Sequence, residues 1–204
     1  MSYANIFELT KCLQDCVEYC RNNPDWAQSE FYLTLLEDAL QELEKSSARA
    51  DQELSQWRME ARDDRLAWKQ LARELAAIQK ALREVNAVGF LDQRVMYRNT
   101  ERLLAAVAEM ITYLREREEE INFASDRIEK LERLRQKALS EGQESDRALD
   151  EYLRFSKLRS NGLTKAKDTI ANVRRAMRRD LGTDHPKYQA IRWPYQVASD
   201  EKVL

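Results

Sequence analysis

The chain has few of the residues that interrupt helices. Its 204 residues include four glycines and three prolines, and none of these lies between Pro24 and Gly89. Glycine loosens a helix and proline removes one of its hydrogen bonds, so this stretch predicts a long unbroken helix. Charged residues make up 34% of the chain, which is typical of solvated helices rather than of sheets or compact enzymes.

Histidine is nearly absent, which bears on catalysis and on metal binding. The one histidine, His185, lies close to the end of the sequence. The chain has no Glu-x-x-His motif, no glycine-rich phosphate loop and no nucleophile elbow. Di-iron bundles, nucleotide-binding proteins and hydrolases depend on these patterns. We therefore expect no enzyme activity and no cofactor.

Long hydrophobic runs are also lacking. No stretch approaches the roughly 18 continuous apolar residues of a membrane span, and no basic start followed by an apolar run indicates a signal peptide. The net charge of −2 gives the whole chain no obvious attraction to nucleic acids or membranes. We expect a soluble cytoplasmic protein that does not bind membranes.

What the chain does have is a sustained heptad pattern. It covers 16 positions at alternating steps of three and four, and 14 of them are apolar. A helix keeps such a pattern in register only by winding around a partner, so we expect a coiled-coil helix from Pro24 to about Ala87. The positions are Leu33, Leu36, Leu40, Leu43, Ser47, Ala50, Leu54, Trp57, Ala61, Asp64, Trp68, Leu71, Leu75, Ile78, Leu82 and Val85.

Shorter patterns and turn residues divide the remainder. Helical spacing predicts a first helix over residues 4–22, a third helix after a tight turn at 88–91, and a fourth helix that ends at Gly182. Within the third helix we expect a kink or fraying around Gly142, and between the third and fourth helices a turn at Asn161-Gly162.

These elements predict an all-α fold with three parts. A four-helix-bundle head, a long antiparallel coiled-coil stalk and a short extended C-terminal tail follow from folding the long helices back at Gly89. The head would comprise residues 1–45 and 136–182, the stalk 46–135 with its turn at 88–91, and the tail 183–204.

The antiparallel stalk fixes which residues should meet. Those whose numbers sum to about 179 would pair, which places Trp68 beside Ile111 and Asp64 near Arg115. The charge distribution favours packing these two segments together in the head. Residues 1–45 hold three basic and nine acidic residues, whereas residues 154–180 hold nine basic and two acidic ones. The two blocks would attract each other.

Three cysteines stand four residues apart on one face of the first predicted helix. Thiolates of Cys12, Cys16 and Cys20 at this spacing are candidate ligands of a soft metal. A structural zinc site needs a fourth ligand, and none is evident. Free cysteine is also a small core residue, and we favour core packing over metal binding.

The basic fourth helix suggests nucleic acid as an alternative partner. Its cations can bind phosphates in a salt-dependent way, but they can also neutralise the acidic first helix and complement the end of their own helix. We favour the second interpretation. The residues are Lys165, Lys167, Arg174, Arg175, Arg178 and Arg179.

Large aromatic residues are candidates for contacts with a protein partner. Trp57 and Trp68 are bulky for a two-helix seam and would mark a partner surface if exposed, although they can also pack along the neighbouring helix. Asp64 between them would pair with Arg115 or Arg117, or fix the register of the seam. In the tail, Tyr188, Trp193 and Tyr195 suit either folding back on the head or docking into a partner.

The tail also carries a resemblance. Its segment Gly182-Thr183-Asp184-His185-Pro186-Lys187-Tyr188 resembles the ending of uncharacterised bacterial helical-bundle proteins, several of them cyanobacterial, in which a last helix runs into Gly-x-Asp-x-Pro-x-Tyr. A Gly-Gly pair often follows in those proteins, whereas this chain continues with Ile191-Arg192-Trp193-Pro194. The resemblance implies a helical bundle and a bacterial source, but no activity.

Together these patterns predict a non-enzymatic scaffold or adaptor. Its stalk and tail would bind other proteins or further copies of the chain. Nucleic-acid binding through the fourth helix and soft-metal binding by the cysteines are the alternatives.

Overall fold

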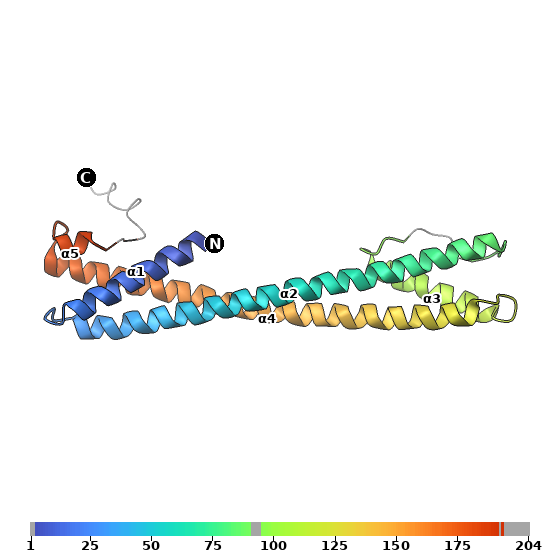
Figure 1. Cartoon of the computed structure of the whole chain (residues 1–204), viewed down its shortest axis with the longest axis horizontal. Helices are drawn as coiled ribbons and strands as arrows, with labels where there is room; N and C mark the ends of the chain where they lie inside the picture. The colour runs from blue at the N-terminus through green and yellow to red at the C-terminus, as the bar shows by residue number, and fades with distance from the viewer. Residues whose placement is uncertain (1–2, 91–94, 192, 194–204) are drawn as a thin grey trace. The chain divides into compact units, whose positions relative to one another are not determined.

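The protein is all-α, as the sequence predicts. A computed structural model describes residues 3–90, 95–191 and 193, and these contain five helices and no strand (Figure 1). The helices are α1 (Tyr3–Asn22), α2 (Ser29–Glu84), α3 (Thr100–Glu116), α4 (Ala124–Leu181) and α5 (Pro186–Gln189).

The described residues form two compact units, and both α2 and α4 contribute to each of them. The first unit contains the chain up to Glu53 and the chain from Tyr152 onward. The second unit is Leu54–Glu151. The divisions therefore fall inside helices, at other places than the predicted boundaries at residues 45 and 136.

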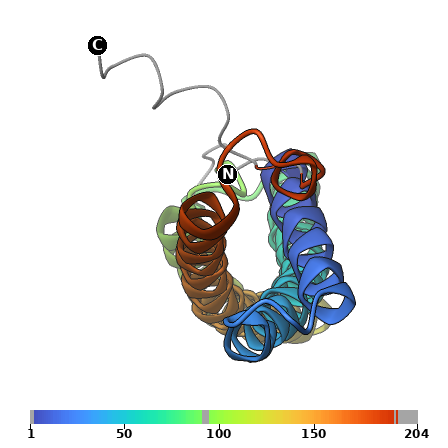
Figure 2. The ribbon, with the colours of Figure 1, turned by 90° about the vertical axis from the view of Figure 1, so that its left-hand side faces the viewer.

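The first unit packs α1 against one segment each of α2 and α4 around a common core (Figure 2). Asn23 follows α1, and its side chain donates a 2.8 Å hydrogen bond to the Tyr19 carbonyl. Ser29 begins α2, five residues later than predicted, and its hydroxyl donates to the Cys20 carbonyl at 2.5 Å. These two bonds satisfy carbonyl groups that the end of a helix leaves without partners.

The predicted turn at Asn161-Gly162 is wrong, because α4 continues through it. Gly162 faces α2, and a Cβ atom there would lie 3.0 Å from Ser46 Oγ and 3.6 Å from Leu43 Cα. The glycine therefore permits a close approach of two helices instead of ending one. As a result the predicted fourth helix is the end of α4, and the first unit has three long helical segments where we expected four.

The C-terminal segment is not an extended tail throughout, since part of it folds onto the first unit. Gly182 ends α4 with a φ of +85°, a conformation that glycine adopts without strain. His185 then caps α5 by accepting a hydrogen bond from the Lys187 amide. Tyr188 and Trp193 are buried in the core of the first unit, and Trp193 Nε1 donates to the Tyr188 carbonyl at 3.1 Å.

The second unit contains α3 and the remaining segments of α2 and α4, and here the predicted hairpin is wrong. Lys69 of α2 lies 5.1 Å from the Tyr97 ring centre, and Tyr113 of α3 donates to the Val88 carbonyl at 3.0 Å. Tyr97, just before α3, thus lies beside the middle of α2, and Tyr113, near the end of α3, lies beside the chain that follows α2. α3 therefore runs parallel to α2. Trp68 and Ile111 share this core, but their predicted antiparallel register does not exist.

The antiparallel partner of α2 in this unit is α4. Arg127 of α4 contacts Glu74 of α2 at 2.5 Å, and Gly142 lies opposite Asp64. α3 ends early, at Glu116, and α4 then returns along α2. Four glutamates, Glu116 and Glu118–Glu120, gather there, where the helix dipole disfavours negative charge.

Gly142 does not fray α4, contrary to our expectation. The helix continues from Ala124 to Leu181 without interruption. A Cβ atom at Gly142 would meet only Asp64 Oδ1, at 3.4 Å. Neighbouring helical turns hold this position in place, so its low helix propensity does not decide the local structure.

Candidate protein-docking groove

A groove runs between α2 and α4 in the first unit, and α1 does not line it. Its volume is about 550 Å³. Phe155 and Leu158 of α4 supply its apolar surface, and Leu158 remains 45% exposed. The lining residues are Asp38, Gln41, Glu42, Lys45, Ser46, Arg49, Phe155, Leu158 and Lys165.

Helical spacing explains why these side chains share one surface. On α2, Asp38, Glu42, Lys45 and Arg49 follow one another at steps of four, three and four residues. Side chains three or four positions apart lie on the same face of a helix. This stripe lies beside the core stripe of α2, so its charged side chains flank the contact with α4.

Ion pairs and a ring contact fix the walls of the groove. Lys165 Nζ of α4 lies 2.6 Å from Glu42 Oε2 of α2, and its hydrogen bond with Glu42 raises the pKa of Lys165. The Arg49 guanidinium lies 5.0 Å from the centre of the Phe155 ring. Such contacts hold an aromatic side chain in place at the surface.

Charge in the groove changes sign along α2. Asp38 and Glu42 make its first part acidic, and Lys45 and Arg49 make the following part basic. An apolar floor with charged walls suits an amphipathic helix, which buries its apolar face and pairs its flanking charges. The groove can therefore bind a helix by packing and ion pairing.

The tryptophans predicted as partner contacts do not line this groove. Trp68 is only 8% exposed and donates a 2.7 Å hydrogen bond from Nε1 to Asp64 Oδ1, so it is a core residue of the second unit. Trp57 is half-buried. Tyr188 and Trp193 belong to the core of the first unit, and Tyr195 lies outside the described residues.

Asp64 does not pair with the arginines predicted for it. Arg115 contacts Glu132 at 2.5 Å, and Arg117 contacts Glu116 at 3.4 Å. Burial raises the pKa of Asp64, and nearby Asp146 raises it further, against the effect of the Trp68 hydrogen bond. The parallel direction of α3 explains the error, because it carries Arg115 away from Asp64.

The three cysteines are core residues. Cys12, Cys16 and Cys20 are at most 1% exposed and belong to the core of the first unit. A hydrogen bond with Cys12, followed by burial, raises the pKa of Cys16. Burial raises the pKa of Cys20 to about 11. Both shifts favour the neutral thiol over the thiolate that binds metals.

One acidic group, which we did not predict, has ligand atoms close together. Among the described residues, Glu60, Glu141 and Glu144 are the only three His, Cys, Asp or Glu side chains with ligand atoms within 4.8 Å of one another. The cysteines do not form such a group. Sequence alone does not reveal the acidic one, because α2 and α4 must first be aligned.

Four of the six cations of the predicted nucleic-acid surface have partners within the first unit. Lys165 contacts Glu42, Arg179 contacts Asp180, and Arg174 contacts the Tyr188 hydroxyl. Arg175 donates to Asn172, whereas Arg178 is exposed and Lys167 half-buried. These contacts are with residues of α2, α4 and α5, and both the neutralisation of the first helix and nucleic-acid binding stay predictions.

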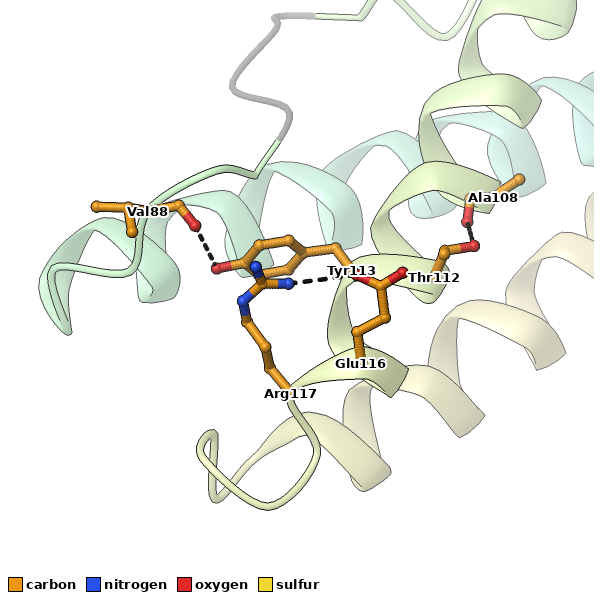
Figure 3. A network of polar contacts seen from close by, with 6 residues as sticks. All are labelled: Val88, Ala108, Thr112, Tyr113, Glu116 and Arg117. Carbon is orange, nitrogen blue, oxygen red and sulfur yellow. Dashed lines mark hydrogen bonds and ion pairs between the residues drawn. The ribbon is translucent and has the colours of Figure 1, made fainter.

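A second unpredicted contact network fixes the chain after α2. Figure 3 shows the Tyr113 ring of α3 between the Val88 carbonyl and the Arg117 side chain. The Arg117 guanidinium lies 4.3 Å from the ring centre. This network positions the end of α3 against the connection that follows α2, which is a structural role.

Comparison with known proteins identifies no relative. Family models, curated proteins and solved structures were compared, and none matches the chain. The resemblance of the tail to bacterial helical-bundle proteins stays a prediction. In the described part of the chain, no helix has the length and apolar character to cross a bilayer.

Proposed function

We propose that the chain is a non-enzymatic cytoplasmic scaffold that binds a helix of another protein molecule in the groove between α2 and α4. The open groove of the first unit carries this proposal, because it exposes Leu158 beside a fixed aromatic ring. Apolar side chains in a polar rim are the usual centre of a protein interface.

The predicted four-helix head is relevant to this proposal. The first unit has three long helical segments around its core, with α5 added at one end. A helix laid along α2 and α4 would add a fourth segment and cover Leu158. Helix addition of this kind uses apolar residues three, four and seven positions apart on the incoming helix.

Selection from a displayed library of helical peptides tests the function. We expect purified full-length protein to select amphipathic helices, and Leu158→Glu to weaken their binding at least tenfold, because it places a charge in the apolar floor. Leu66→Glu is the matched control, since Leu66 is 44% exposed and lies in the second unit. Failure to select any helix, or equal loss with both variants, would refute the proposal.

A further inference from the structure

Two charged residues of the groove are placed so that a two-fold axis could pair them between two molecules. Asp38 and Lys45 lie seven residues apart on α2, which places them on the same face two turns apart. Neither forms a direct ion pair with a residue that the structure describes. Their charges are opposite, and Gln41 and Glu42 stand midway between them.

We propose that the occupant of the groove is a second copy of this chain. If two copies pack their α2 helices antiparallel about a two-fold axis near Gln41 and Glu42, Asp38 of each copy meets the partner's Lys45. A two-fold interface uses the same surface on both molecules, so both ion pairs form together. The proposal rests on the docking function above and names its partner.

The apolar part of the groove lies to one side of this axis, at its Arg49 end. Phe155 and Leu158 are three residues apart on α4, on the wall opposite the charged stripe. Lys165 contacts Glu42 near the axis and Arg49 contacts Phe155, so Phe155 and Leu158 lie about two to three helical turns from the axis. In the dimer they would lie beside the first turns of the second copy's α2, and two α2/α4 pairs would form a four-helix arrangement. Leu158, now 45% exposed, would become buried.

The existing ion pairs support this arrangement. Glu42 is already paired with Lys165 at 2.6 Å, and Arg49 with Glu53 at 2.8 Å. These pairs leave Asp38 and Lys45 as the charges of the stripe without a direct ion pair, although Asp38 also acts electrostatically on Lys165. Each would otherwise face a like charge in a parallel, in-register packing, so the antiparallel arrangement is the one that charge favours.

Charge reversal tests the proposal directly. We expect full-length protein to dimerise in light scattering and analytical ultracentrifugation. Asp38→Lys and Lys45→Glu should each weaken the dimer at least tenfold, because each variant brings like charges together twice. Mixing the two variants should restore dimers, and so should the double variant Asp38→Lys/Lys45→Glu, since both reunite opposite charges.

Two control variants reverse charge elsewhere on the first unit. Glu30→Lys and Lys11→Glu change exposed residues outside the groove, and we expect them to dimerise like the unchanged chain. Two results would overturn the inference: a monomer at every soluble concentration, or single variants whose loss is not restored by mixing. A monomer that still binds selected helices in the groove would refute the dimer but leave the docking function intact.

Discussion

Gly162 of α4 faces Ser46 of α2 so closely that a Cβ atom at Gly162 would lie 3.0 Å from Ser46 Oγ. The hydroxyl has limited freedom to move, because it donates to the Leu43 carbonyl at 3.2 Å. The Leu43 Cα atom lies 3.6 Å from the same Cβ position. This glycine thus allows α2 and α4 to pack closely in the first unit.

Gly162→Ala should therefore destabilise the protein, although alanine is the better helix former. We expect the free energy of unfolding to fall by about 1 kcal/mol, the overpacking cost exceeding the gain in helix propensity. Urea unfolding monitored by circular dichroism measures it. Adding Ser46→Ala removes the obstructing oxygen, so Gly162→Ala in that background should be neutral or stabilising. A more stable Gly162→Ala single variant would contradict the prediction.

Gly142→Ala should have the opposite effect. The new Cβ atom would meet only Asp64 Oδ1, at 3.4 Å, which is an ordinary contact distance. Gly142 lies within α4, so the substitution gains about 1 kcal/mol in helix propensity and reduced unfolded-state entropy. The midpoint of urea unfolding should rise. A lower midpoint would mean that α2 and α4 lie closer at Gly142 than the contact distance indicates.

These two glycines show how much of the fold the sequence can predict. The heptad pattern correctly predicts that α2 is long, and the spacing of Cys12, Cys16 and Cys20 predicts that they share one buried face. Local propensity predicts that Gly142 and Gly162 interrupt the helix, because it does not reveal that a second helix needs the space of a missing side chain. Propensity is readily overridden by tertiary contacts.

The sequence also does not predict whether α3 runs parallel or antiparallel to α2. Gly89 was expected to reverse the chain, and its φ of +79° fits a turn. The residues after it lead to α3, which runs parallel to α2, as the contact between Lys69 and Tyr97 shows. Apolar spacing predicts that a helix has a buried face, but not the direction in which the helix lies on its neighbour.

The candidate groove was missed for a related reason. Its α2 charges, among them Asp38 and Lys45, have the spacing of any solvated helix face. Only the alignment of α2 with α4 brings Phe155 and Leu158 beside them. The predicted partner residues Trp68 and Trp193 were chosen for their size, and size predicts burial as well as it predicts contact with a partner.

Glu74 should make the second unit less stable at low pH. Burial alone would raise the pKa of Glu74, but Lys130 at 2.7 Å and Arg127 at 2.5 Å reverse the effect, so its pKa is lowered. A carboxylate with a lowered pKa stabilises the fold above its unfolded pKa of about 4.3 and loses that contribution as pH falls through its folded pKa. We expect the free energy of unfolding to decline below about pH 4.3.

Glu74→Gln should remove part of that acid dependence. It should also cost about 2 kcal/mol at neutral pH, because it leaves two cations without their carboxylate. Urea unfolding between acid and neutral pH measures both effects. Glu84→Gln is the matched control, since its pair with Lys80 is 3.8 Å long and exposed, and such pairs contribute little. Equal acid dependence in Glu74→Gln and the unchanged chain would contradict the prediction.

The cysteines should be unreactive while the protein is folded. Cys12, Cys16 and Cys20 are buried, and only the thiolate attacks a disulfide reagent. We expect Ellman's reagent to label no thiol in the folded protein at neutral pH, and all three in urea. Rapid labelling without denaturant would show that α1 opens readily from the first unit, and would remove the argument for a core role.

Cys20 should also make the protein less stable in alkali. Its pKa is about 11 in the folded state, against about 8.5 in an unfolded chain. A raised pKa means that the folded state holds the proton more tightly, so its contribution is complete below about pH 8.5 and is lost as pH rises toward 11. Cys20→Ala should flatten the fall in unfolding free energy over this range, whatever its stability at neutral pH. A slope unchanged by Cys20→Ala would assign the alkaline loss to other groups.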